Sequence, residues 1–186
     1  MNSLSEEEKK ELLKIARTSI TEYLKNRRIP SFSPSSPALL ERKGAFVTLK
    51  KAGFLRGCIG MIEAIKPLYQ TVAEMAVAAA IEDPRFPPLT LDELPLITIE
   101  ISVLSPLEEV EDVEEIEVGK HGLYIVRGFY RGLLLPQVAT EYNWDRETFL
   151  QHTCLKAGLP TDCWQDPATK IYKFSAEVFS EDELDL

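Results

Sequence analysis

The sequence has few of the residues that most often carry catalysis or covalent cross-links. Its 186 residues include three cysteines and two histidines. Three cysteines cannot all pair, and Cys58, Cys154 and Cys163 lack the spacing of an extracellular disulfide framework. His121 and His152 offer little from which to build a Cys–His pair or a zinc site. We therefore expect a reducing, cytoplasmic location, with no metal and no other cofactor.

Basic residues and long apolar runs are also scarce. Lys and Arg number 21 against 30 Asp and Glu, so the formal charge is 21 − 30 = −9. Nucleic acids and anionic membranes bind clustered cations, so we expect neither as a partner. Apolar stretches such as 76–81 fall far short of the roughly 20 residues that span a bilayer. The first residues lack the basic and apolar segments of a signal peptide.

The sequence does contain patterns typical of both helices and strands. Ser5 and Glu8 have the spacing of a capping box, which predicts the start of a helix. Strict alternation of apolar and polar residues predicts a half-buried strand over 97–104. Similar patterns predict a hairpin over 45–50 and 55–62, a helix after Pro67, strands over 122–127, 131–135 and 169–179, and helices over 137–142 and after Asp145.

The order of these elements indicates the fold class. Strands and helices do not alternate regularly, which disfavours a doubly wound parallel sheet and favours a mixed α+β fold with antiparallel sheets. Pro106 and Pro167 interrupt the regular elements of the chain and suggest an inserted lobe between them. The acidic run 108–117 is predicted to be a solvated surface, and 181–186 a loose acidic tail.

The most unusual segment is Leu55-Arg56-Gly57-Cys58-Ile59-Gly60. In a regular strand Arg56, Cys58 and Gly60 share one face, whereas Leu55 and Ile59 point to the other and can enter a core. A guanidinium near a thiol lowers the thiol pKa, and glycines leave room for a ligand. The alternative is that Cys58 is a small core residue and that the glycines permit close packing.

Three further polar residues are candidates for a site. Glu100 would pair with Arg56 if its strand joins the same sheet. Asp83 and Arg85 lie in a rigid proline-rich loop, a common position for functional groups. The alternatives are a helix-end role for Asp83 and a structural salt bridge for Arg85.

The remaining histidines and cysteines favour structural roles. His152 is predicted to lie on the exposed side of its helix, and His121 in a turn. We expect Cys154 to be a core residue and Cys163 a loop residue, because their spacing with His152 matches no usual zinc pattern.

Taken together, several segments resemble the AMMECR domain family. They are the LRGCIG hexapeptide at 55–60, 83–86, 100–105, 134–139, Trp144, 149–150, 156–159 and Trp164. The similarity extends over about residues 5–180 and includes the complete hexapeptide.

The resemblance implies two unequal lobes, each an antiparallel sheet flanked by helices, with a cleft between them. The larger lobe would comprise 1–105 plus 168–186, and the smaller inserted lobe 106–167. The resemblance implies that the hexapeptide points toward the cleft, and that the cleft is large enough for a sizeable partner but not basic enough for nucleic acid. We expect a peptide or protein there. Prokaryotic relatives are named as one component of a system with a Memo-like protein and a radical SAM enzyme.

Two functional hypotheses follow. In the first, the protein is an enzyme or protein-modification factor in which Cys58 is a nucleophile or a covalent attachment point. Arg56 would stabilise the thiolate or bind an anionic group, and Glu100 would orient Arg56. Leu55, Gly57, Ile59, Gly60, Asp83 and Arg85 would complete the binding surface. In the second, the protein is a non-catalytic adaptor that acts with Memo-like and radical SAM proteins. The absence of a base beside Cys58 favours the second hypothesis, whereas the expected cleft favours the first. The sequence therefore does not decide between them.

Overall fold

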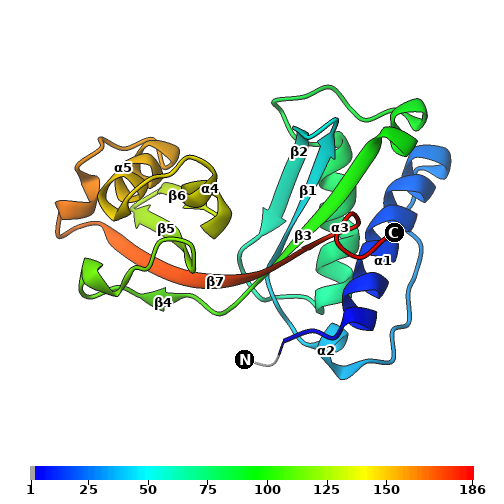
Figure 1. Cartoon of the computed structure of the whole chain (residues 1–186), viewed down its shortest axis with the longest axis horizontal. Coiled ribbons are helices and arrows are strands. Elements are labelled where there is room, and N and C mark those ends of the chain that lie inside the picture. Colours follow the sequence, from blue (N-terminus) through cyan, green and yellow to red (C-terminus); the bar gives the residue numbers. More distant parts are fainter. Residues whose placement is uncertain (1–2) are drawn as a thin grey trace. The chain divides into compact units, whose positions relative to one another are not determined.

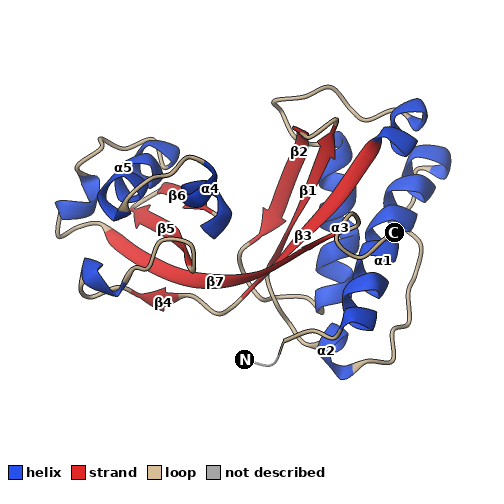
Figure 2. Ribbon diagram, in the orientation of Figure 1, coloured by secondary structure: helices blue, strands red, loops and turns tan. Residues whose placement is uncertain are grey.

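A computed structural model describes residues 3–186, and the fold divides into two compact units (Figures 1 and 2). Unit 1 consists of the described residues up to Leu104 together with Glu177–Leu186, and unit 2 is Ser105–Ala176. β7 (Lys170–Ser180) contributes residues to both. The lobe boundaries expected from the sequence, at 105/106 and 167/168, stay a prediction. No helix within the described residues combines the length and the apolar character needed to cross a bilayer.

Unit 1 begins with α1 (Glu6–Asn26), whose start is the predicted capping box. The Ser5 hydroxyl accepts the Glu8 N–H at 3.1 Å, and the Glu8 carboxylate accepts the Ser5 N–H at 2.8 Å. The other elements of this unit are α2 (Pro37–Leu40), β1 (Ala45–Lys51), β2 (Phe54–Met61), α3 (Leu68–Ile81), the 3-10 helix η1 (Leu91–Leu96) and β3 (Ile97–Leu104).

The antiparallel order β2-β1-β3 gives the sheet of unit 1 one apolar face and one polar face. Val47 and Leu49 alternate with polar neighbours and are fully buried, as are Ile99 and Ile101. α1 and α3 cover this apolar face (Figure 2). The opposite face carries Thr48 and its register partners Cys58 and Glu100, which form one row across the three strands.

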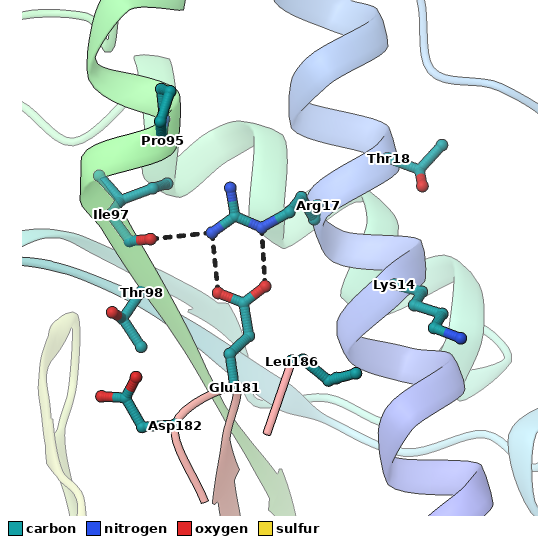
Figure 3. Close-up of a pocket in the computed structure, with 9 residues that line it drawn as sticks. All are labelled: Lys14, Arg17, Thr18, Pro95, Ile97, Thr98, Glu181, Asp182 and Leu186. Carbon is teal, nitrogen blue, oxygen red and sulfur yellow. Dashed lines mark hydrogen bonds and ion pairs between the residues drawn. The ribbon is translucent and has the colours of Figure 1, made fainter. Parts of the chain in front are cut away.

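The C-terminal segment, residues 181–186, is held to α1 within unit 1 by an ion pair (Figure 3). The Arg17 guanidinium donates to both carboxylate oxygens of Glu181, at 2.7 and 2.8 Å, and to the carbonyls of Leu94 and Ile97. The Glu181 carboxylate also accepts the Ile99 N–H, and the Glu181 N–H donates to the Ile99 carbonyl. The prediction of a loose tail from residue 181 is therefore wrong at Glu181, which is buried.

Unit 2 is a smaller antiparallel sheet with its own core. Its elements are β4 (Glu108–Glu109), η2 (Val113–Glu115), β5 (His121–Arg127), β6 (Tyr130–Leu134), α4 (Pro136–Glu141), α5 (Arg146–Lys156), η3 (Cys163–Gln165) and most of β7. β5 pairs with β6 and β7, and β4 pairs with β7. Phe149, Leu150 and Ile125 are buried in its core.

The expectation that Cys154 and Cys163 are separate core and loop residues is wrong. They form a disulfide between α5 and η3, with Cα atoms 5.9 Å apart, and both are buried. Disulfides persist in oxidising compartments and also in intracellular proteins of hyperthermophilic archaea. The bond is therefore compatible with more than one location.

Candidate functional site

The hexapeptide forms most of β2, where a β-bulge breaks the expected alternation. Gly57 is opposite Leu49, but Leu55 is opposite Lys50, so Arg56 has no partner in β1. Leu55 consequently lies beside Lys50 and is exposed, and the prediction that Leu55 enters the core is wrong. Ile59 does pack against the core.

Two glycines of the hexapeptide allow close packing. A Cβ on Gly57 would overlap the carbonyl oxygen of Ala79, so α3 approaches β2 closely only because this residue has no side chain. A Cβ on Gly60 would overlap the ring of Phe46. These glycines therefore serve packing in the structure, as the alternative interpretation expected.

Cys58 is half-buried, and both its thiol and its backbone N–H are bonded. Its Sγ lies 3.2 Å from the Thr48 Oγ1, and its N–H donates to the Asp83 Oδ2 at 2.9 Å. Burial raises the pKa of the Cys58 thiol above its ordinary value, and Asp83 and Glu100 act in the same direction. The Thr48 hydroxyl and the Arg85 charge oppose this rise without cancelling it. At neutral pH Cys58 is therefore a thiol.

Asp83 and Arg85 form the most tightly bonded part of the site. The buried Asp83 carboxylate accepts the Arg85 guanidinium at 3.0 and 2.8 Å, and it also accepts the N–H groups of Arg85 and Cys58. The guanidinium, assisted by these N–H groups, holds the pKa of Asp83 well below its usual range despite burial. The Arg85 pKa is raised by the same hydrogen bond. The Arg85 side chain nevertheless remains 49% exposed, so part of a fixed cation faces solvent.

Arg56 pairs with Glu93 and not, as predicted, with Glu100. Its Nη2 donates to the Glu93 Oε2 at 2.9 Å. Glu100 instead bonds the Lys50 Nζ at 3.4 Å. The reason is the strand order: β1 lies between β2 and β3, and Glu100 is in register with Thr48 and Cys58. The cation that opposes the rise of the Cys58 pKa is Arg85, whereas the Arg56 guanidinium is bonded to Glu93. A role of Arg56 on a Cys58 thiolate stays a prediction.

Sequence reasoning missed Glu93 and Phe86. Burial would raise the Glu93 pKa, but hydrogen bonds from Arg56, the Thr90 N–H and Lys51 outweigh it and hold the value at about 2. Thr90 and Glu93 form a capping box at the start of η1, a spacing that is visible in the sequence. The Phe86 ring lies beneath both guanidinium groups, 5.9 Å from the Arg56 Cζ and 5.6 Å from the Arg85 Cζ.

The two histidines have structural partners within unit 2. The buried His121 accepts the Glu117 N–H at its Nδ1, and burial lowers the His121 pKa. His152 stacks on Trp144 with ring centroids 4.0 Å apart, so the prediction of an idle, exposed side chain is wrong. In the described part of the chain, no group of three or more His, Cys, Asp or Glu side chains could hold a metal ion.

A separate pocket of about 490 Å³ lies between α1, β3 and the C-terminal segment (Figure 3). The Arg17–Glu181 pair lies at the centre of the view, with Lys14 on α1 and Asp182 on the C-terminal segment. The hydrogen bonds of this pair go to protein groups, so its visible role is to attach the segment.

Comparisons with known proteins are consistent over almost the whole chain. A family model described as AMMECR1 matches residues 13–179. A protein of Methanothermobacter thermautotrophicus is 52% identical in an alignment 188 residues long that covers 96% of this chain and 97% of that protein. Protein TK0174 of Thermococcus kodakarensis is 47% identical over 182 residues, covering 92% of this chain and 89% of its own. The crystal structure of uncharacterized protein PH0010 from Pyrococcus horikoshii has a TM-score of 0.88 at 45% identity, covers 91% of this chain and 89% of that one, and confirms the α+β fold.

Proposed function

The chain belongs to the AMMECR1 family, and we propose that it is a non-catalytic module that binds an anionic segment of a partner protein at Arg85. The observation that carries this proposal is the Asp83–Arg85 pair. Asp83 uses both carboxylate oxygens to fix the guanidinium, yet half of the Arg85 side chain stays exposed. A cation held in one orientation loses little side-chain entropy when it binds a carboxylate or phosphate.

The state of Cys58 favours binding over catalysis. A cysteine nucleophile reacts as the thiolate and is normally activated by a base or by a lowered pKa. Burial raises the Cys58 pKa, and its side-chain hydrogen-bond partner is the hydroxyl of Thr48. Cys58 would then shape the surface beside Arg85 without reacting.

Expected partners are a Memo-like protein and a radical SAM enzyme, in keeping with the family resemblance. The same proposal includes a peptide or protein bound in a cleft between lobes. It also includes a cytoplasmic location. The direct experiment measures binding of each purified partner to the wild type and to Arg85→Gln. The control is Arg28→Gln, which removes an equal charge from an exposed position just after α1. We expect Arg85→Gln to weaken binding at least about tenfold, the scale of one charge-assisted contact, and Arg28→Gln to have no effect.

One observation supports the alternative of an enzyme or modification factor. The Arg85 charge opposes the rise that burial causes in the Cys58 pKa. Binding of a substrate would then complete the activation of the thiol. Cys58→Ser separates the two functions. Full partner binding together with complementation of a deletion strain supports the module. Loss of complementation with intact binding, together with a covalent adduct on Cys58, would establish the enzyme.

A further inference from the structure

A second pocket in unit 1, of about 460 Å³, lies between the proline-rich connection at 29–32 and α3. Ile29 and Phe32 line it from the connection, and Tyr69, Ala73 and Glu74 line it from the helix. Its volume is within the range of about 300–1,000 Å³ that is typical of small-molecule sites. None of these residues belongs to the Arg85 site.

The wall formed by the connection is held mainly by packing. Residues 29–36 form no helix or strand. Within the described chain, no hydrogen bond joins any of residues 29–35 to another residue. Segments of this kind open locally at low free-energy cost, whereas α3 has a continuous helical ladder. The pocket therefore has one rigid wall and one that can move.

Glu74 in the rigid wall has an unmatched carboxylate oxygen. Its Oε1 accepts the Lys66 Nζ at 2.6 Å, but its Oε2 is buried and has no hydrogen-bond partner within the described residues. Most buried polar side-chain atoms have a partner, and an unmatched acceptor costs free energy. A ligand donor that reaches Oε2 would satisfy this oxygen.

The other wall groups favour a cationic donor. The faces of aromatic rings attract ammonium groups, and Phe32 and Tyr69 line the same pocket as Glu74. The Glu74 carboxylate is paired with Lys66 through Oε1, so the group still unmatched is the acceptor Oε2. A ligand without a donor would leave this oxygen unmatched. The net charge of −9 also favours a cation.

From these observations we infer that the pocket binds an organic ammonium group. The Glu74 carboxylate accepts its N–H, Phe32 and Tyr69 contact the charge, and Ile29 and Ala73 contact the alkyl part. A free polyamine and the lysine side chain of a peptide both offer this chemistry. The inference is independent of the function proposed for Arg85.

The test titrates the full chain with putrescine and, separately, with N-acetyl-lysine amide, using calorimetry and amide chemical shifts at constant ionic strength. Glu74→Gln keeps the shape of the side chain and removes its charge. Glu82→Gln is the matched control, because Glu82 is the exposed C-cap of the same helix. Lys66→Met removes the cation that competes for the carboxylate.

We expect saturable binding with shift changes in residues 29–32 and the first half of α3. Glu74→Gln should weaken it about tenfold, Glu82→Gln should leave it unchanged, and Lys66→Met should maintain or strengthen it. Tighter binding of putrescine would identify a free amine as the source, and tighter binding of the lysine amide a peptide. Equal affinity in Glu74→Gln, weaker binding in Lys66→Met, or no saturable binding of either probe to a folded wild type would overturn the inference.

Discussion

Replacing Glu181 by alanine is expected to loosen the contact of residues 181–186 with α1 and β3 inside unit 1. The Glu181 side chain is only 9% exposed and accepts two hydrogen bonds from Arg17 and one from the Ile99 N–H. Alanine removes all three acceptor contacts. Arg17 keeps its bonds to the carbonyls of Leu94 and Ile97, and its side chain is 32% exposed, so water can solvate part of the remaining charge.

These contacts set the size of the effect. Breaking a fully buried ion pair costs about 3–5 kcal/mol, and the partial exposure of Arg17 places this pair at the lower end, about 3 kcal/mol. For a chain of this length that loss corresponds to a fall in Tm of about 6–12 °C. Glu181→Gln keeps one acceptor oxygen and should lose about half as much free energy.

The assay is urea unfolding followed by circular dichroism, combined with hydrogen exchange at the Ile99 and Glu181 amides. Both amides are bonded in this contact, so both should exchange faster in Glu181→Ala. The control is Glu183→Ala, an equal charge removed from an exposed position of the same segment. An ordinary surface substitution changes the free energy of unfolding by up to about 0.5 kcal/mol. If the free energies of unfolding of Glu181→Ala and Glu183→Ala differ by less than this, the ion pair does not hold the segment.

Three further predictions concern other parts of the chain. Burial raises the Cys58 pKa and the Arg85 charge opposes this rise, so iodoacetamide should alkylate Cys58 slowly at pH 7. The pH midpoint of the alkylation rate should lie above that of a free thiol, and Arg85→Gln should move it higher. Rapid alkylation at neutral pH would contradict the assignment. Against the effect of burial, hydrogen bonds from Arg56, Thr90 and Lys51 hold the pKa of Glu93 in the folded state at about 2, below its ordinary value of 4.5. The stabilisation that these bonds give is therefore present above pH 4.5 and is lost as the pH falls toward 2. The free energy of unfolding should therefore fall less steeply with decreasing pH in Glu93→Gln than in the wild type. An unchanged slope would show that Glu93 does not contribute to stability in this way. Replacing Cys154 and Cys163 by serine should cost about 2–3 kcal/mol, because the bond closes a short loop; a wild type that is equally stable with and without reductant would show that the bond does not contribute.

Local patterns predicted the elements well where one physical signal dominated. The strand over Ile97–Leu104 was predicted with its bounds, because apolar and polar residues alternate from Ile97 to Val103. Its half-buried character holds over 97–100, whereas 101–104 are buried throughout. The capping box of Ser5 and Glu8 is present as predicted, because it depends on residues three positions apart. The antiparallel α+β class followed from the irregular order of helices and strands.

The partners within the site could not be predicted in the same way. The bulge at Arg56 and the position of β1 between β2 and β3 determine which charges meet, and neither leaves a local pattern. Glu93 was predictable as the third residue of a capping box, but not as the partner of Arg56. The Cys154–Cys163 bond depends on how η3 packs against α5, so the spacing of the cysteines alone did not indicate it.

The hydrogen bond from the Cys58 N–H to Asp83 has a consequence for solubility. β2 is the first strand in the order of the sheet, and an uncovered outer strand offers N–H groups to which a strand of another molecule can add. Asp83 occupies one of these groups with a buried carboxylate that stays ionised because Arg85 is bonded to it. The Asp83–Arg85 pair thus does two things: it presents a cation to solvent, and it removes one N–H group of the outer strand from pairing with another molecule.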